Sequence, residues 1–507
     1  GKAVQPWDEK SFKLPGGGPY HPAGIQNFMV GNAMLRKQSY GNYPAVLNLM
    51  KAVYEGTQVP MDAALRIETR YFIKTLMTPQ AQAMIRSLFL SKQELDKGAV
   101  RPAGVPKSDP KKVTVIGAGM MGAGIAYSTA IKGVPVVLKD VSIEAAEKGK
   151  AYSQKLLEKR VSRGRMTAEK KDQILALIQP TADAKDLQGC DLIIEAVFEN
   201  QALKAKVTEE AEQYLIDGGV MASNTSTLPI TGLAQASKNA KNFIGLHFFS
   251  PVDKMQLVEI IKGHETSDET LARAYDFVQQ IAKTPIVVND SRGFFTSRVF
   301  GTFVQEGMRL LAEGVLPAKI EMAALKAGMP VGPLAIQDEV SLSLSEHVTN
   351  ETRKALQAEA KDLPKSPVED VIAEMIHKHG RKGKVAGAGF YEYPENGKKH
   401  LWDGLSRWTK DHDISEQDMI DRFLFVQALD TLRCYEENVL ESVIDANVGS
   451  IFGIGFAPWT GGAIQFLNQN GIEKSLQRSE QLAAQYGERF NPPQLLKDKA
   501  QKKEIIQ

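Results

Sequence analysis

A short apolar run that leads directly into a glycine-rich turn constrains the fold of this chain more than any other feature. Val113–Ile116 is followed by Gly117, Gly119 and Gly122 in a G-x-G-x-x-G pattern, and a helical stretch follows from Ile125. The first glycine permits a tight turn, the second lets the backbone approach a diphosphate, and the third allows close packing of helix on strand. The free N–H groups of the helix would face the phosphates. The pattern predicts a dinucleotide-binding turn, with a plain glycine turn as the alternative.

An acidic residue at the end of the next apolar run extends this prediction. The run Val134–Leu138 ends at Asp140, 18 residues after Gly122. A carboxylate there is placed to accept hydrogen bonds from an adenosine ribose, and it would repel a 2′-phosphate. The sequence therefore favours NAD over NADP as cofactor, with a solvated aspartate as the alternative.

Further apolar runs continue the alternation of strands and helices. They lie at Leu192–Val197, Val220–Ala222 and Phe243–Leu246, with helical segments between them. Strands that alternate with helices form parallel sheets with helices on both faces. We therefore predict an α/β fold with a Rossmann-type, doubly wound parallel sheet.

The length of 507 residues predicts several domains. Residues 1–45 are punctuated by proline and glycine and are predicted to be loop-like, whereas Pro44–Gln93 has a helical pattern. Proline and glycine are dense from Gly98 to Pro110, which is typical of a linker. The predicted units are residues 1–97, a linker at 98–110, a nucleotide-binding domain at 111–291, and two helical domains at 292–400 and 401–507.

The two helical domains are predicted to be copies of each other. A shift of 124 residues pairs Arg298 with Arg422 and Glu313 with Glu437. The same offset aligns four more identities, namely Arg309 with Arg433, Val315 with Val439, Leu316 with Leu440, and Ile320 with Ile444. One constant offset favours duplication of a helical domain. Chance similarity between amphipathic helices is the alternative.

Charge and cysteine content exclude several classes of protein. Lys and Arg number 62 against 60 Asp and Glu, and this near balance argues against broad binding to nucleic acid. Cys190 and Cys434 are the two cysteines, which excludes a disulfide framework and favours a reducing compartment.

No cysteine and histidine spacing suggests zinc, so no metal is predicted. The start, Gly1 to Ala3, has no signal-peptide pattern and is interpreted as the start of a fragment or a processed chain.

A histidine and a glutamate form the candidate catalytic pair. His247 ends an apolar run at the edge where doubly wound sheets bind ligands, and Glu259 follows 12 residues later within the apolar run Gln256–Ile261. A buried glutamate is rare unless it is paired. Such a carboxylate would set the tautomer of the imidazole and raise its basicity. Spacing alone leaves a histidine satisfied within the core as an equal alternative.

Taken together, these motifs resemble the L-3-hydroxyacyl-CoA dehydrogenase family. The resemblance is carried in order by Gly117–Gly124, Asn224-Thr225-Ser226-Thr227, His247-Phe248-Phe249-Ser250-Pro251 and Leu257-Val258-Glu259. Ser250–Leu257 further resembles the α-subunits of multifunctional fatty-acid β-oxidation complexes, including the trifunctional enzyme type. The match covers about residues 113–471, including the duplicated helical domain.

The resemblance also reaches the N-terminal residues. Residues 1–97 resemble the C-terminal helices of the crotonase-fold enoyl-CoA hydratase domain of those α-subunits, notably at Arg66–Phe72. The family's hydratase active site lies further upstream. Hydratase activity is therefore not expected from this chain.

The family's site residues transfer onto this sequence by position. The resemblance implies that His247 is the general base for the 3-hydroxyl, that Glu259 orients it, and that Ser226 contacts both the substrate oxygen and the cofactor. Other positions match the family's NAD site, namely Gly117, Gly119, Met121, Gly122, Asp140, Val197, Glu199, Lys204 and Ser250. For Glu199 and Lys204 the alternative is a solvated start of a helix.

Two serines depart from the single-function dehydrogenases, which have asparagine at both positions. Ser250 corresponds to a cofactor contact and Ser297 to a substrate contact. A serine is shorter and carries one hydroxyl in place of an amide, so each contact must lengthen or use water. The substrate role of Ser297 rests on the resemblance alone.

Two further segments have open interpretations. The basic stretch Lys148–Lys171 is typical of a solvated helical face and could alternatively attract the 3′-phosphate of coenzyme A. The uncharged segment Ala446–Ile472 is too rich in glycine and polar residues for a spanning helix. It is interpreted as a buried glycine-rich turn, with contact to an acyl chain, a partner subunit or a membrane surface as the alternative.

These observations predict NAD-dependent oxidation of L-3-hydroxyacyl-CoA to 3-oxoacyl-CoA in fatty-acid β-oxidation. A catalytically weak acyl-CoA-binding or assembly module is the alternative, and a dehydrogenase of free hydroxy acids is a third reading. The resemblance implies acyl-CoA as substrate, with a thiolase β-subunit, a homodimer and peripheral membrane contact as candidate partners. The expected location is the cytoplasm in a bacterium or the mitochondrial matrix in a eukaryote, with the cytoplasm preferred.

Overall fold

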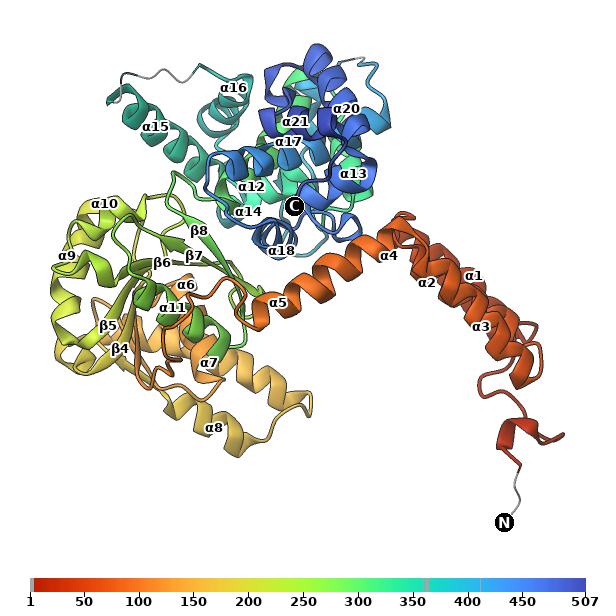
Figure 1. Ribbon diagram of the computed structural model, residues 1–507, viewed down its shortest axis with the longest axis horizontal. Coiled ribbons are helices and arrows are strands. Elements are labelled where there is room, and N and C mark those ends of the chain that lie inside the picture. Colours follow the sequence, from red (N-terminus) through yellow and green to blue (C-terminus); the bar gives the residue numbers. More distant parts are fainter. Residues whose placement is uncertain (1–3, 359, 361–363, 411) are drawn as a thin grey trace.

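The chain folds into an arm of N-terminal helices, a sheet with helices on both faces, and a helical C-terminal half (Figure 1). The computed structural model describes residues 4–358, 360, 364–410 and 412–507. Gly1 to Ala3, on which the interpretation of the chain's start rests, lie outside the described residues. Residues 359 and 361–363, within the predicted first helical domain, lie outside them too.

Eight strands form one sheet in the order β3-β2-β1-β4-β5-β6-β7-β8. The strands are β1 (Val113–Ile116), β2 (Val136–Lys139), β3 (Ile178–Thr181), β4 (Cys190–Glu195), β5 (Leu215–Ser223), β6 (Phe243–Phe248), β7 (Leu257–Lys262) and β8 (Thr284–Asn289). The strand order reverses between β1 and β4, and ligands of doubly wound sheets bind at such a switch point. The predicted α/β fold class is confirmed.

One strand pair departs from the predicted parallel sheet. β6 and β7 are antiparallel, whereas every other neighbouring pair in this sheet is parallel. Only residues 249–256 connect β6 to β7. This loop is too short for the crossover that a parallel pair requires. β3 contains no apolar run, and the short run Ile286–Val288 in β8 was not predicted as a strand.

The helices between the strands cover the two faces of the sheet (Figure 1). They are α6 (Met120–Ala130), α7 (Ile143–Ser162), α8 (Ala168–Ala176), α9 (Gln201–Ala211), α10 (Ile230–Ala234) and α11 (Asp268–Gln280). α6 begins at the glycine-rich turn. α7 packs against β2 and β3, and the far end of the hairpin that it forms with α8 extends beyond the sheet (Figure 1).

The N-terminal arm corrects one expectation. Residues 1–45 were predicted to be loop-like, but Pro22–Ser39 forms helix α1. Pro22 occupies the first helical turn, where the missing N–H costs nothing. A Cβ atom at Gly24 would lie 2.0 Å from Gly18 O, so this glycine lets the preceding turn pack on the helix. The arm continues with α2 (Pro44–Gly56) and α3 (Met61–Leu76).

A long helical segment joins the arm to the body of the molecule (Figure 1). It consists of α4 (Pro79–Met84), a π-helical stretch (Ile85–Ser91) and α5 (Lys92–Asp96). Its end is fixed to α11, because the Tyr275 hydroxyl donates to Leu95 O at 2.5 Å. In the following linker, Arg101 pairs with buried Asp276 of α11 at 2.8 Å.

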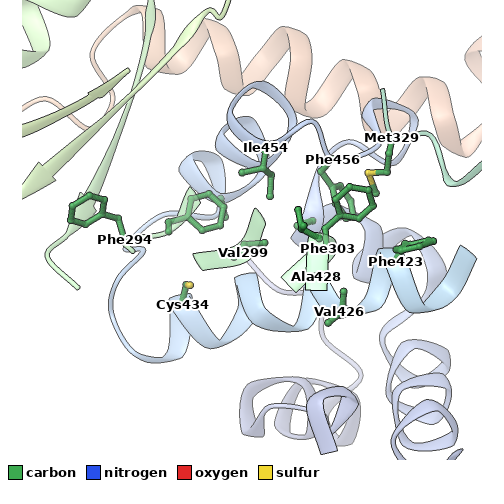
Figure 2. Close-up of a cluster of buried hydrophobic side chains, with 14 of the residues drawn as sticks. Phe294, Val299, Phe303, Met329, Phe423, Val426, Ala428, Cys434, Ile454 and Phe456 are labelled. Carbon is green, nitrogen blue, oxygen red and sulfur yellow. The ribbon is translucent and has the colours of Figure 1, made fainter. Parts of the chain in front are cut away.

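The C-terminal half is built around α12 (Thr296–Glu313) and α17 (Glu416–Glu436), which pack against each other. Its other helices are α13 (Pro317–Ala327), α14 (Pro333–Val340), α15 (Leu342–Ala358), α16 (Pro367–Ala373), α18 (Val443–Ile454), α19 (Ala463–Asn470), α20 (Ile472–Tyr486) and α21 (Gln494–Lys502). A short hairpin of β9 (Tyr391–Glu392) and β10 (His400–Leu401) lies between α16 and α17. Figure 2 shows the apolar core, where Phe303 meets Phe423 with ring centroids 5.3 Å apart.

Ion pairs between the two predicted copies are reciprocal. At the offset of 124 residues, Arg298 corresponds to Arg422 and Glu313 to Glu437. Arg298 Nη2 donates to Glu437 Oε1 at 3.0 Å, and Arg422 Nη1 donates to Glu313 Oε2 at 2.6 Å. Each copy thus supplies the arginine to the other's glutamate, as two like domains related by a two-fold axis would. This arrangement supports the duplication, while the boundary at residue 400 stays a prediction.

The described residues provide neither a membrane-spanning helix nor a cluster of metal-ligating side chains. No described helix is both long and apolar enough to cross a membrane. Within the same residues, no group of three or more His, Cys, Asp or Glu side chains is placed to hold a metal ion.

Candidate active site

The glycine-rich turn forms a cradle at the switch point of the sheet. Gly117 has φ +95°, and a Cβ atom there would lie 2.7 Å from Ala196 O. A Cβ atom at Gly122 would lie 1.7 Å from Gly117 O, so this glycine allows α6 to pack on the turn. A Cβ atom at Gly119 would meet nothing within 4 Å. Gly117 and Gly122 therefore serve packing, whereas Gly119 faces open space that a ligand can approach.

The start of α6 offers its backbone amides to that space. Gly119 is the N-cap residue and supplies no side-chain hydrogen bond to the first turn. The first N–H groups of a helix have no partner within the helix and carry partial positive charge. Met121, which the sequence places in the cofactor site, is half-buried in this first turn. The cradle therefore fits the diphosphate of a dinucleotide.

Asp140 lies beside the cradle, as predicted. Its Oδ2 accepts from Ala118 N at 2.6 Å and its Oδ1 from Val141 N at 2.7 Å. Each carboxylate oxygen has two lone pairs, so each keeps an acceptor position for ribose hydroxyls. The two contacts fix the carboxylate against the turn. These residues fit NAD.

Glu199 organises the loop that follows β5. Its Oε1 accepts from Ser226 N at 3.0 Å, Thr227 N at 3.1 Å and the Thr225 hydroxyl at 2.6 Å. The Ser226 hydroxyl also donates to it at 3.2 Å. Burial raises the pKa of Glu199, but the Lys204 charge and these hydrogen bonds outweigh burial, and the pKa lies below its usual value. The loop that carries Ser226 is therefore fixed by a charged carboxylate.

Lys204 is not part of a solvated helix start. Its side chain is 2% exposed, and Nζ lies 3.0 Å from Glu195 Oε1 and 3.5 Å from Glu199 Oε2. Glu195 ends β4 and also accepts from the Ser223 hydroxyl of β5. Val197, which was predicted in the cofactor site, is half-buried two residues after the end of β4. Its backbone N–H donates to Glu195 Oε2 at 3.3 Å. Lys204 thus ties the ends of β4 and β5 together beneath the surface, and its direct contact with NAD stays a prediction.

The register of the β6–β7 hairpin pairs the two candidate catalytic residues. His247 and Glu259 are direct partners across the antiparallel strands, so their side chains lie on the same face. His247 Nδ1 lies 2.9 Å from Glu259 Oε2. The glutamate is 0% exposed and the histidine 7%. The predicted His–Glu pair is therefore present in the structure.

The start of α12 completes the surroundings of Glu259. Phe295 N and Thr296 N donate to Oε1 at 3.1 and 3.0 Å, and the Thr296 hydroxyl donates to Oε2 at 2.5 Å. A helix N-terminus stabilises a buried carboxylate in its ionised form. An ionised carboxylate can only accept, so Nδ1 of His247 carries the proton and Nε2 is left as an acceptor. No described residue hydrogen-bonds to Nε2, which is thus available as a base.

The three predicted serine contacts lie at the same edge of the sheet. Ser226 follows β5 and Ser250 follows β6, and these strands are neighbours. Ser250 is exposed, and its hydroxyl lies 3.6 Å from Met120 Sδ at the cradle. Ser297 is half-buried in the first turn of α12, directly after Thr296. Their contacts with cofactor and substrate stay predictions.

Thr296 was not among the predicted site residues. It lies 37 residues from Glu259 in a run of ordinary apolar and hydroxyl residues, and no short motif marks it. The buried ion pair of Lys204 with Glu195 was missed as well. The sequence signal for it was the charged Glu195 directly after the apolar residues Leu192–Ile194.

Comparisons with known proteins agree with this geometry. Residues 112–291 match the model of the 3-hydroxyacyl-CoA dehydrogenase NAD-binding domain, and residues 293–393 match that of the C-terminal domain. The chain is 34% identical over 487 residues to the fatty acid oxidation complex subunit alpha of Pseudomonas syringae pv. syringae, covering 93% of this chain. It spans 66% of the length of that relative.

Solved structures show the same likeness. A 3-hydroxybutyryl-CoA dehydrogenase from Escherichia coli K12 is 25% identical with a TM-score of 0.66, over 78% of this chain and 99% of that chain. An (S)-3-hydroxybutyryl-CoA dehydrogenase from Ralstonia eutropha is 34% identical with a TM-score of 0.52, over 57% of this chain and 100% of that chain. The chain therefore belongs to the 3-hydroxyacyl-CoA dehydrogenase family of NAD-dependent oxidoreductases.

Proposed function

We propose that this chain oxidises L-3-hydroxyacyl-CoA to 3-oxoacyl-CoA with NAD in fatty-acid β-oxidation. The observation that carries the proposal is the buried His247–Glu259 pair, 2.9 Å apart, at the edge of the sheet where the dinucleotide cradle lies. The relatives and their printed names support both the reaction class and the pathway.

The residues divide the work of this reaction between them. Nε2 of His247 takes the proton of the 3-hydroxyl group, and the resulting imidazolium is stabilised by the ionised Glu259. Glu199 fixes the backbone of Ser226, whose hydroxyl turns from this carboxylate to donate its single proton to the substrate oxygen. NAD, when bound, supplies the acceptor for the hydride that leaves carbon 3. The start of α12 covers Glu259 and keeps water away from its carboxylate.

A basic cavity supports a coenzyme A ester as the substrate. It has a volume of about 430 Å³ and lies between α6, the α7–α8 hairpin and the loop that follows β6. Five cationic side chains line it against one carboxylate, Asp253; the cations are Lys132, Arg160, Lys170, Lys254 and Lys283. Coenzyme A carries a diphosphate and a 3′-phosphate, which such a cluster attracts. We therefore assign this cavity to the nucleotide part of the substrate.

The loop that borders this cavity also adjoins the catalytic site. Lys283 Nζ donates to Val252 O at 2.7 Å and to Met255 O at 2.6 Å, and the Tyr152 hydroxyl of α7 donates to Asp253 at 2.9 Å. Burial lowers the pKa of Lys283 to about 8, opposed by the charge of Asp253. The loop thus connects the cavity with Ser250 and His247.

Replacement of the proposed base tests the function. His247→Gln should abolish NADH formation from L-3-hydroxybutyryl-CoA, measured by the absorbance of NADH, while the far-UV circular dichroism stays unchanged. His264→Gln, at an exposed histidine after β7, is the control and should retain full activity. Turnover by His247→Gln would refute the proposal. Tight binding of the substrate without turnover by the unmodified chain would instead favour the acyl-CoA-binding module.

Partners and location are part of the proposal as well. The printed name of the relative from Pseudomonas syringae pv. syringae describes the alpha subunit of a complex, which supports assembly with a further subunit. That this further subunit is a thiolase is our proposal. We propose a bacterial cytoplasmic location, and the two buried, unpaired cysteines are compatible with it. Size-exclusion chromatography with and without a thiolase subunit tests the association and also detects a homodimer.

A further inference from the structure

Thr296 contacts the catalytic pair but lies outside the residues that the motifs single out. Its hydroxyl donates to Glu259 Oε2 at 2.5 Å, the same oxygen that faces His247 Nδ1 at 2.9 Å. The threonine oxygen itself lies 3.4 Å from Nδ1. Two donors therefore converge on one carboxylate oxygen.

The other carboxylate oxygen is occupied as well. Oε1 accepts the backbone N–H groups of Phe295 and Thr296. An ionised carboxylate offers about four acceptor positions. All four positions are used in this structure. One of them is used by the Thr296 hydroxyl, which a substitution can remove without changing the backbone donors.

The rotamer of Thr296 is fixed from its other side. Its methyl group faces α18 of the second helical copy, where a Cβ atom at Gly453 would lie 3.1 Å from Thr296 Cγ2. The side chain is 0% exposed. A β-branched residue has few χ1 options, so packing of the methyl group against α18 aims the hydroxyl at Glu259.

We propose that Thr296 is a positioning residue that sets the strength of the catalytic base. A donor to Glu259 draws negative charge away from the oxygen that faces His247, so the imidazolium is stabilised less than it would be by a carboxylate without that donor. The hydroxyl thereby limits how strongly Glu259 favours the protonated ring. This inference rests on the proposed function, in which His247 acts as the base.

The pH dependence of kcat/KM for L-3-hydroxybutyryl-CoA tests this role. Thr296→Val keeps the shape of the side chain and removes the donor. The pH of half-maximal kcat/KM should rise by about half a unit or more, with the plateau at high pH largely retained. Thr296→Ser, which restores the hydroxyl, should return the midpoint to that of the unmodified chain.

The outcomes separate this inference from the proposed function. If Thr296→Val fails to fold, Thr296→Ala removes the same donor without the branched methyl groups and should show the same upward shift. A uniform loss of kcat/KM at every pH, with an unchanged midpoint in whichever variant folds, would overturn the inference and indicate a purely structural threonine. Absence of turnover by the unmodified chain would instead refute the proposed function itself.

Discussion

Arg160 lies on α7 and lines the basic cavity that we assign to coenzyme A. Its replacement by alanine should raise KM for L-3-hydroxybutyryl-CoA roughly threefold to tenfold, because a phosphate contact at a solvent-accessible site contributes about 1 kcal/mol. kcat should change little, since the cavity does not contain the reacting carbon. Steady-state kinetics at low and high salt checks this, and high salt should reduce the difference.

Two controls make the Arg160 experiment specific. Lys155→Ala removes a cation of the same helix that does not line the cavity, and KM should stay unchanged. A thioester of pantetheine, which lacks the nucleotide, should give equal KM values for Arg160→Ala and the unmodified chain. An equal increase in KM for both substrates would contradict the assignment of the cavity.

At the scale of single residues, the sequence predicted polar groups near recognisable strand ends. Two of these residues, His247 and Asp140, end apolar runs, and Glu259 lies within one. A charged side chain buried in such a run implies a hydrogen-bonding or charged partner. Thr296 could not be predicted, because its role depends on a contact between residues 37 positions apart. The burial of Lys204 was missed for a different reason, because a charged residue at the end of a strand, such as Glu195, is normally solvated.

At the scale of elements, α18 packs its glycines against the sheet and the start of α12. A Cβ atom at Gly453 would lie 2.7 Å from Leu257 Cδ2 and 3.1 Å from Thr296 Cγ2. Gly453→Ala should therefore push these buried side chains and cost about 1–3 kcal/mol of stability, as overpacking does. It should also raise the pH of half-maximal kcat/KM, because the displaced threonine contacts Glu259.

Urea denaturation and steady-state kinetics measure both effects of Gly453→Ala. Gly301→Ala in α12 is the matched control, because a Cβ atom there meets nothing within 4 Å. It should be neutral or stabilise the chain by up to about 1 kcal/mol. If both variants were equally stable and active, the close approach of α18 would have no functional consequence.

Elements were predictable where one local pattern decided them. The strand–turn–helix unit at residues 113–130 was predicted because the glycines, the apolar run and the helix agree. Helix α1 was missed because Pro22 and Gly24 normally punctuate loops, whereas here they serve the helix start and a close packing contact. The antiparallel direction of β7 was not predicted, because an apolar run does not indicate the direction of its strand. The segment Ala446–Ile472 was interpreted as a glycine-rich turn, but α18 and α19 occupy much of it.

At the scale of the whole molecule, a buried acid lies where the second helical copy meets the edge of the sheet. Asp445, in the first turn of α18, is 1% exposed, and its Oδ1 has no hydrogen-bond partner among the described residues. The backbone of the neighbouring segment pairs with the edge strand, since Asn289 N donates to Val439 O at 2.9 Å. Burial raises the pKa of Asp445 to about 8, opposed by the N–H of Val287 and helped by the charge of Glu441. The sequence could not indicate this, because an aspartate in a first helical turn is normally a solvated one.

This raised pKa makes the docking of the second copy dependent on pH. In the unfolded chain the carboxyl ionises near pH 4, whereas in the folded chain it stays protonated up to about pH 8, so folding binds a proton in this window. The stabilising contribution is complete below pH 4 and is lost as the pH rises through 8.

Asp445→Asn, which is neutral at every pH, should therefore be more stable than the unmodified chain at pH 9 by at least about 1 kcal/mol, with little difference at pH 4. Thermal unfolding across this range measures the difference, and Asp217→Asn at an exposed aspartate should show none. A stability difference that did not grow with pH would mean that Asp445 is ionised in the folded chain, and its buried charge would then need a partner that the contacts around it do not supply.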